Sequence, residues 1–316
     1  MRSTTSCETK SMPTMPKFNF STRPAKNVER RMIVEACRRL SAVAPLETYR
    51  YVGFGGIEFM DFELMHRILG IRIMTSIEKD LQWPARYKFN RPFRTVAVLT
   101  GRASEHLSAL DWDGLRIVWL DYEWQLRDEV IRDCETVARV LHPGSLLIVT
   151  IQARGEFSGR VGTKLEDLKR NVAEDRIPLG ITEESLEGKW GFARAQRQIL
   201  TEAVNDVVER RGDGARLRQV FNFFYADDVR MQTSGWIVSS TGLDRTVDTC
   251  RFEELDFVRM GDEPMVIEVP VLTDRELQYL NQKLPLKKRA RLRESWLDPG
   301  VQETYAKLYQ WYSDQT

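Results

Sequence analysis

Five short runs of mainly apolar residues occur in the first half of the chain. Each is six or seven residues long and is followed by a stretch of mixed character. Strands buried on both faces of a parallel sheet have this continuous apolar character, whereas strands with one solvent-exposed face alternate between apolar and polar residues. The runs therefore predict the strands of a mostly parallel sheet. They cover residues 49–54, 71–77, 94–99, 115–120 and 145–151.

Between these runs, apolar residues recur at three- and four-residue spacing, which is typical of amphipathic helices. Such stretches cover residues 27–40, 58–69 and 129–141. We expect Asn27 to cap the first of them and Gly70 to end the second. Strands that alternate with helices through short connections predict an α/β fold with helices on both faces of the sheet.

The second half of the chain has a different pattern. Residues 155–215 are charged and mainly helical in character, and 192–211 is the longest candidate helix. A strongly aromatic run over 219–226 and a second run over 231–239 flank the acidic pair Asp227-Asp228. Two strand-like runs joined by a tight polar turn predict an antiparallel hairpin.

The remaining segments predict short strands at 255–259 and 265–269, followed by helix from Thr273, with Glu276 completing a capping box. The first 20 residues are polar and carry two prolines, so we expect them to be flexible. Three parts follow. They are a flexible segment (1–20), a cofactor-binding domain (21–270) with a helical insertion (155–215), and a small helical C-terminal extension (271–316).

Composition excludes several classes of protein. The 316 residues carry 47 Lys and Arg against 46 Asp and Glu, a net charge of +1, which excludes a strongly basic nucleic-acid coat and disorder driven by charge. Four Cys and three His have no metal-ligand spacing. No apolar run approaches the roughly 20 residues of a membrane span, and residues 1–7 lack the apolar core of a signal peptide. We expect a cytoplasmic protein with reduced thiols, in which Cys37 and Cys134 are buried.

A glycine-rich turn, Gly53-Phe54-Gly55-Gly56, follows the first apolar run directly. Glycines let the backbone turn sharply and approach a ligand closely, although such a turn also occurs without a ligand. Glu78 ends the second apolar run, 22 residues after Gly56 (78 − 56). An acidic residue there can accept both hydroxyls of a ribose. The alternative interpretation of Glu78 is a charge at a helix N-terminus.

The turn departs from the dinucleotide-binding pattern G-x-G-x-x-G. Glu58 stands at the third glycine position. A carboxylate there would repel a pyrophosphate, which argues against NAD or FAD. It is compatible with a cofactor that carries an amino-acid ammonium group.

Taken together, these segments resemble the class I S-adenosylmethionine-dependent methyltransferases, which have a Rossmann-like fold. The resemblance rests on the glycine-rich turn, on Glu78, on the segment 101–107 after the third run, and on Asp121-Tyr122 after the fourth. The hairpin over 220–238 looks like the reversed last strand of that family. The resemblance implies S-adenosylmethionine as cofactor and methyl transfer as the reaction.

The resemblance spans roughly residues 27–240 and implies a set of cofactor contacts. Arg102 stands where many relatives have an acidic adenine-binding residue, so the adenine contact passes to Ser104 or to a backbone group. The expected cofactor-binding residues are Gly53, Phe54, Gly55, Gly56, Glu58, Glu78, Lys79, Ser104 and Asp121.

The segment 119–124, Trp-Leu-Asp-Tyr-Glu-Trp, concentrates the most chemistry, because strand C-termini in open α/β sheets face the ligand crevice. We expect Asp121 and Tyr122 to be the catalytic residues that orient the acceptor. The alternative is that Tyr122 belongs to the core and Asp121 caps the next helix. The expected substrate-binding residues are Arg23, Lys26, Glu123 and Trp124, the first two from a basic N-terminal segment that folds over the cleft.

Two further features bear on partners. Asp121 and Glu123 suggest a metal site, but the Asp-Asn pair of metal-dependent relatives is missing at 149–152, so we expect no metal. Six basic residues crowd 283–293 near Trp296, a pattern that suits either a nucleic-acid contact or a solvated helix face.

The sequence thus predicts a methyltransferase whose acceptor is a nucleic acid or a small molecule, with no membrane partner. Methyl transfer needs positioning of the reactants more than acid–base groups, so few residues in the sequence indicate what the acceptor is. The alternative is a non-catalytic protein on the same fold, a nucleotide or cofactor sensor or a subunit of an assembly. A nucleotide-dependent oxidoreductase is a third hypothesis, which Glu58 disfavours because its carboxylate would repel a pyrophosphate.

Overall fold

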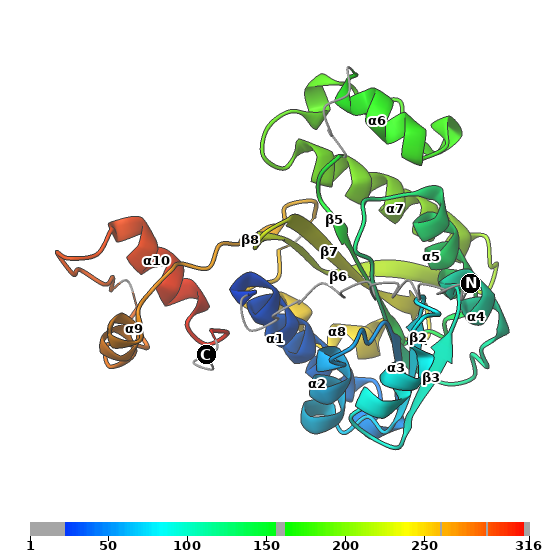
Figure 1. The fold of residues 1–316 in the computed structure, drawn as a ribbon, viewed down its shortest axis with the longest axis horizontal. Coiled ribbons are helices and arrows are strands. Elements are labelled where there is room, and N and C mark those ends of the chain that lie inside the picture. Colours follow the sequence, from blue (N-terminus) through cyan, green and yellow to red (C-terminus); the bar gives the residue numbers. More distant parts are fainter. Residues whose placement is uncertain (1–22, 156–161, 260, 289, 313–316) are drawn as a thin grey trace, which may run out of the picture.

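The computed structural model describes residues 23–155, 162–259, 261–288 and 290–312; the segment 1–20, expected to be flexible, lies outside them. The described residues form one eight-stranded sheet in the order β3-β2-β1-β4-β5-β7-β6-β8 (Figure 1). The strands are β1 (Arg50–Gly53), β2 (Ile73–Glu78), β3 (Val96–Thr100), β4 (Arg116–Asp121), β5 (Leu146–Gln152), β6 (Ala215–Ala226), β7 (Arg230–Ser240) and β8 (Met265–Ile267).

Strands β1 to β5 pair in parallel, while β7 runs antiparallel to both β5 and β6. The predicted α/β class and the hairpin on a mostly parallel sheet are therefore confirmed. Because β1 lies between β2 and β4, the carboxyl ends of these three strands meet at one edge. That edge carries the glycine-rich turn, Glu78 and Asp121.

Ten α-helices are described. They are α1 (Pro24–Arg39), α2 (Met60–Leu69), α3 (Pro84–Asn90), α4 (Ala103–Ala109), α5 (Asp128–Val140), α6 (Lys164–Asn171), α7 (Gly191–Glu209), α8 (Asp244–Asp248), α9 (Asp274–Asn281) and α10 (Pro299–Leu308). Short 3₁₀ helices cover Leu40–Ala42, Leu46–Thr48, Glu174–Arg176, Glu184–Leu186 and Phe252–Glu254.

Two hydrophobic clusters sandwich the sheet, because alternate strand residues point to opposite faces. Trp119 faces the cluster that contains α1 and α2, whereas its neighbours Val118 and Leu120 face the cluster of α5 and α7. Cys37 and Cys134 are fully buried free thiols in α1 and α5, as expected. No described helix is both long enough and apolar enough to cross a membrane.

The structure differs from the expected elements in several places. Residues 255–259 form no strand; Leu255 and Phe257 are apolar because they pack into the core from an irregular segment. Helix α1 begins at Pro24, so Asn27 lies inside it rather than capping it. Strand β6 begins at Ala215, four residues earlier than expected, and the short helices α3 and α4 were not expected.

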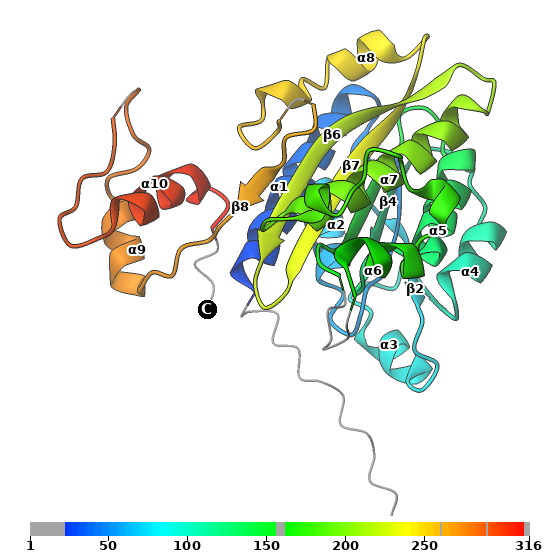
Figure 2. The ribbon, with the colours of Figure 1, turned by 90° about the horizontal axis from the view of Figure 1, so that it is seen from above.

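Helices α9 and α10 lie beside the sheet and share a small hydrophobic cluster of their own (Figure 2). The predicted capping box at Thr273 and Glu276 is confirmed. The end of α10 returns to the main core, where the Trp311 ring lies 5.2 Å from that of Phe257.

Candidate functional site

The glycine-rich turn rests against the end of β2. Gly53 pairs in register with Ser76, which places the turn beside the last residues of the neighbouring strand. The N–H of Gly55 is shared between Glu78 Oε1 and Ser76 Oγ, each at 2.9 Å, and Ser76 donates its own hydroxyl to Glu78. Glu78 is thus held on the turn, and its role as a ligand contact stays a prediction.

Burial raises the pKa of Glu78 to about 7, although the donors on Ser76, Gly55 and Gly56 act in the opposite direction. The carbonyl of Glu78 also accepts the N–H of Gly101 at 2.9 Å, which ties the end of β3 to the same point. Hydroxyl groups that donate to this carboxyl group would favour its ionised form and so lower its pKa.

Two glycines of the turn have distinct roles. Gly56 has a φ of 58°, and a Cβ there would meet no atom within 4 Å, so the space outside the turn is open. At Gly55 a Cβ would lie 2.5 Å from the Phe59 ring and 2.7 Å from Ser76 Oγ. The turn therefore packs closely on its inner side and presents open space on its outer side.

We expect Gly55→Ala to displace the turn and separate it from Glu78, because neither Phe59 nor Ser76 is free to yield in the core. The free energy of unfolding should fall by about 1–3 kcal/mol, the usual cost of overpacking. Urea denaturation measures it. Gly180→Ala is the matched control, since a Cβ there has no neighbour within 4 Å. Equal stability of the two variants would contradict the packing described for the turn.

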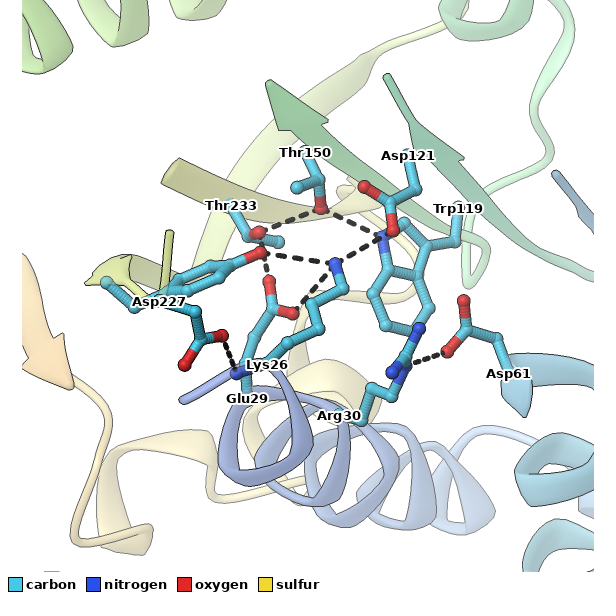
Figure 3. A network of polar contacts seen from close by, with 10 residues as sticks. Lys26, Glu29, Arg30, Asp61, Trp119, Asp121, Thr150, Asp227 and Thr233 are labelled. Atoms are coloured by element: carbon cyan, nitrogen blue, oxygen red, sulfur yellow. Dashed lines mark hydrogen bonds and ion pairs between the residues drawn. The ribbon is translucent and has the colours of Figure 1, made fainter. Parts of the chain in front are cut away.

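A buried ammonium lies beside Asp121 at the end of β4 (Figure 3). Lys26 Nζ is 2.8 Å from Asp121 Oδ2 and 2.9 Å from Glu29 Oε2, and it donates to the Tyr225 hydroxyl at 3.2 Å. All three N–H bonds of the ammonium are thereby used. Burial alone lowers the pKa of Lys26, but the Asp121 and Glu29 carboxylates outweigh it and raise that pKa well above its ordinary value. Lys26 is held as a cation.

A chain of hydrogen bonds leads to the second carboxylate. Trp119 Nε1 donates to Thr150 Oγ1 at 3.0 Å, the Thr150 and Thr233 hydroxyls are 2.7 Å apart, and Thr233 donates to Glu29. Because Thr233 donates its one hydroxyl proton to Glu29, the Thr150 hydroxyl must be the donor to Thr233. Thr150 and Thr233 are register partners across β5 and β7.

The chain of donors fixes the charge of the cluster. Burial raises the pKa of Glu29, opposed by the Lys26 ammonium and the Thr233 hydroxyl. Its Oε1 accepts the Thr233 hydroxyl and its Oε2 lies 2.9 Å from Lys26 Nζ, and both contacts favour the carboxylate form. One cation with two carboxylates leaves one excess negative charge. The Asp121 side chain is 21% exposed, against 7% for Lys26 and none for Glu29, so the cluster meets solvent at Asp121.

Helix α1 is fastened at two points. Asp227, in the turn between β6 and β7, accepts the N–H groups of Ala25 at 2.9 Å and Lys26 at 3.1 Å, so it caps the helix from a distant part of the chain. One turn further on, Arg30 pairs with Asp61 at the start of α2 at 2.6 Å (Figure 3). These contacts place Lys26 over the carboxyl edge of the sheet.

Residues 18–314 match the model of a family described as "Putative O-methyltransferase". The chain belongs to this family. Its expected placement among the Rossmann-like class I methyltransferases is confirmed, and the sheet order agrees with it. No curated protein matches the chain.

This methyltransferase also has distant structural neighbours. Trm1 from Pyrococcus horikoshii, solved with S-adenosyl-L-methionine, is 10% identical over 72% of this chain and 58% of its own, with a TM-score of 0.45. Mitomycin 7-O-methyltransferase MmcR is 15% identical over 64% of this chain and 52% of its own, with a TM-score of 0.33. The chain thus spans a little over half the length of each, and the likeness is one of fold.

The methyltransferase brings most of its expected site residues to one edge. The glycine-rich turn, Glu78, Asp121 and Lys26 lie at the carboxyl ends of β1, β2 and β4 or directly over them. Lys26 is buried with its donors used, so in this structure it holds Asp121 rather than facing a substrate.

Tyr122 directly follows β4, and its side chain packs against α5 rather than beside Asp121. Its side chain lies in the cluster with α5, and its hydroxyl donates to Asp133 Oδ2 at 2.8 Å. The alternative interpretation of Tyr122 as a core residue fits this position, and we propose no catalytic role for its hydroxyl.

The remaining expected residues surround this edge. Lys79 Nζ lies 3.9 Å from the centre of the Trp124 ring, and the Phe54 ring is 5.1 Å from that of Tyr122. Ser104 is exposed on α4. Glu123 is exposed and raises the pKa of Glu78 as a minor cause, whereas partial burial raises the pKa of Glu58, opposed by Arg30 and Arg23.

Sequence reasoning missed several members of the site. Glu29 lies three residues after Lys26, a helical ion-pair spacing, and Ser76 shares a strand face with Glu78, so both had a local signal. Thr150, Thr233 and the cap Asp227 had none, because their role depends on pairing between distant strands. Among the described residues, no three His, Cys, Asp or Glu side chains are grouped to hold a metal ion.

Proposed function

We propose that this methyltransferase uses S-adenosylmethionine and transfers the methyl group to a hydroxyl of its acceptor. The observation that carries the proposal is the meeting, at one sheet edge, of a glycine turn bonded to Glu78 with the solvent-reaching carboxylate of Asp121. The first element suits a nucleoside and the second suits a hydroxyl that must lose its proton. The family description favours oxygen as the methyl acceptor.

The residues at this edge fit such a cofactor. The open space outside Gly56 leaves room for a ligand against the turn, and Glu78 is an acceptor for the ribose hydroxyls. Glu58, exposed at the end of the turn, suits the amino-acid ammonium. Lys79 and Ser104 complete the proposed contacts. The proposed cofactor-binding domain remains residues 21–270, with the helical extension from 271 onward.

When bound, the cofactor supplies an electrophilic methyl group on a sulfonium. The protein contributes position and a proton acceptor. Asp121 would accept the hydroxyl proton of the acceptor, whose oxygen would take the methyl group that the cofactor supplies. Lys26 keeps Asp121 turned toward the edge, and Glu29 in turn fixes Lys26. Trp124, Glu123 and Arg23 remain proposed substrate contacts.

Thermal melting tests the cofactor. S-adenosylmethionine and its demethylated product, each at about 100 times the dissociation constant, should stabilise the fold by roughly 2.7 kcal/mol, whereas NAD and ATP should not. The absence of a shift with both sulfur compounds would overturn the proposal. A shift with NAD instead would favour an oxidoreductase.

Transfer of a labelled methyl group to RNA and to small phenols and alcohols tests the reaction. Asp121→Asn should lower the transfer rate by about 10²–10⁴-fold, the usual contribution of a positioned base, while cofactor binding is retained. Asp113→Asn, an exposed carboxylate elsewhere, is the control and should leave the rate unchanged. Cofactor binding without methyl transfer to any of these acceptors would favour the alternative function of a non-catalytic cofactor sensor.

A further inference from the structure

The loop between α9 and α10 concentrates the charge of the molecule. Residues 283–293 contain six Lys or Arg and no Asp or Glu. Since the whole chain carries +1, the remainder carries −5 (1 − 6). The loop is therefore a local concentration of positive charge that attracts a polyanion.

The conformation of the loop excludes a solvated helix face. None of the described residues between 282 and 298 is helical. Leu284, Leu292 and Leu297 pack into the cluster of Leu277, Leu280 and Tyr305. The basic side chains of the loop that the structure describes are all exposed. They are Lys283, Lys287, Lys288, Arg291 and Arg293. Figures 1 and 2 both show the loop projecting away from the sheet.

A buried glutamine holds the loop in place. Gln302 of α10 donates its amide to the carbonyls of Glu294 at 2.8 Å and Leu297 at 2.6 Å, and it accepts the N–H of Glu294 at 2.8 Å. Gln302 is 2% exposed. Because the loop is anchored before any partner arrives, binding loses little free energy to ordering it.

The carboxylates nearest the loop already have cations. Glu294 pairs with Lys283 and accepts the Tyr279 hydroxyl at 2.9 Å, and Glu303 pairs with Lys307 at 2.8 Å. Within the described chain, no ion pair involves Lys287, Lys288, Arg291 or Arg293. Four cations on one anchored loop thus lack a carboxylate at ion-pair distance.

An exposed aromatic pair adjoins these cations. Trp296 is 49% exposed and Tyr279 is 39% exposed, with their rings edge-on at 5.6 Å. Positive charge that follows a phosphate backbone, together with an aromatic face on which a base can stack, is the combination that binds single-stranded nucleic acid. An acidic protein segment would use the charges and leave the indole face unused.

We propose that the loop 283–293, with Trp296, is a docking surface for single-stranded nucleic acid. Its cations contact successive phosphates, and Trp296 stacks on a base. The binding expected at this surface does not depend on the identity of the methyl acceptor. An experiment can therefore contradict this proposal without contradicting the proposed function.

Fluorescence anisotropy of the full chain with a labelled 20-nucleotide oligouridylate, at 50 and 200 mM salt, tests the surface. Lys287→Gln/Lys288→Gln/Arg293→Gln should bind at least tenfold more weakly and reduce the salt slope by about 2, near 0.7 per phosphate contact. The matched control is Lys88→Gln/Arg132→Gln/Arg139→Gln, which removes the same charge from exposed sites and should bind like the wild type. Equal weakening of both triple variants, or no binding at 50 mM salt, would overturn the proposal.

Trp296→Ala separates nucleic acid from other polyanions. It should weaken oligouridylate binding about 5- to 100-fold, since stacking of one base contributes about 1–3 kcal/mol, and leave binding of polyglutamate unchanged. Melting temperatures of all variants check folding, because every substituted side chain is exposed. If polyglutamate binds as tightly as the RNA and Trp296→Ala alters neither, the partner is an acidic protein and the proposal is wrong.

Discussion

Lys26→Met is expected to lower the free energy of unfolding by about 3–5 kcal/mol, because it leaves two carboxylates beside each other without their cation. Glu29 is fully buried and Asp121 is largely buried, so water replaces little of the lost interaction. Urea denaturation measures the effect. Lys88→Met, on an exposed surface of α3, is the control and should change stability by less than about 0.5 kcal/mol.

The effect of Lys26→Met should depend on pH. Burial already raises the pKa of Glu29, and loss of the ammonium raises it further. The folded variant then binds more protons than the unfolded chain, so its stability falls as pH rises, and the loss is larger at pH 8 than at pH 5. Lys26→Met/Glu29→Gln should recover part of the loss, since it removes the buried negative charge. A loss below about 1 kcal/mol, or no recovery in the double variant, would contradict the charge assigned to this cluster.

Glu78→Gln is expected to weaken binding of S-adenosylmethionine about 10- to 100-fold. A carboxylate accepts two ribose hydroxyls, whereas an amide accepts through one oxygen only, and a hydrogen bond to a charged group contributes about 1.5–3 kcal/mol. Isothermal titration calorimetry measures the affinity. In the wild type, only the ionised form accepts both hydroxyls. With a pKa of about 7, affinity should therefore rise roughly tenfold from pH 6 to pH 8. Glu78→Gln should show no such rise.

The same substitution should stabilise the free protein. The folded pKa of Glu78, about 7, lies above its ordinary value of 4.5, so folding takes up a proton in this interval and wild-type stability falls as pH rises through it. At pH 8, Glu78→Gln should be more stable than the wild type by at most about 3 kcal/mol, and at pH 4 the difference should disappear. Its amide oxygen still accepts from Gly55. A variant that is less stable than the wild type at pH 8 would contradict the raised pKa of Glu78. A variant that binds the cofactor normally would remove Glu78 from the proposed site.

Much of the cofactor edge could be predicted from local pattern. The glycine turn and Glu78 each follow an apolar run directly, and in a parallel sheet the ends of adjacent strands meet. Residues 255–259 show the limit of the same reasoning, since apolar character reports burial and not strand pairing. Tyr122 shows another limit. It packs in the cluster with α5 and donates to Asp133, although both it and Asp121 were expected to face the acceptor.

Local periodicity and spacing were sufficient for the α/β class, the hairpin and the glycine turn beside Glu78, because each depends on residues close together in the chain. The cluster around Asp121 required the folded chain. Lys26 and Asp121 are 95 residues apart (121 − 26), and the Asp227 cap is 201 residues from the Lys26 N–H that it accepts. Only sheet pairing and the docking of α1 bring such charges together. Once they are buried, their mutual contacts rather than their residue types determine which of them reaches solvent.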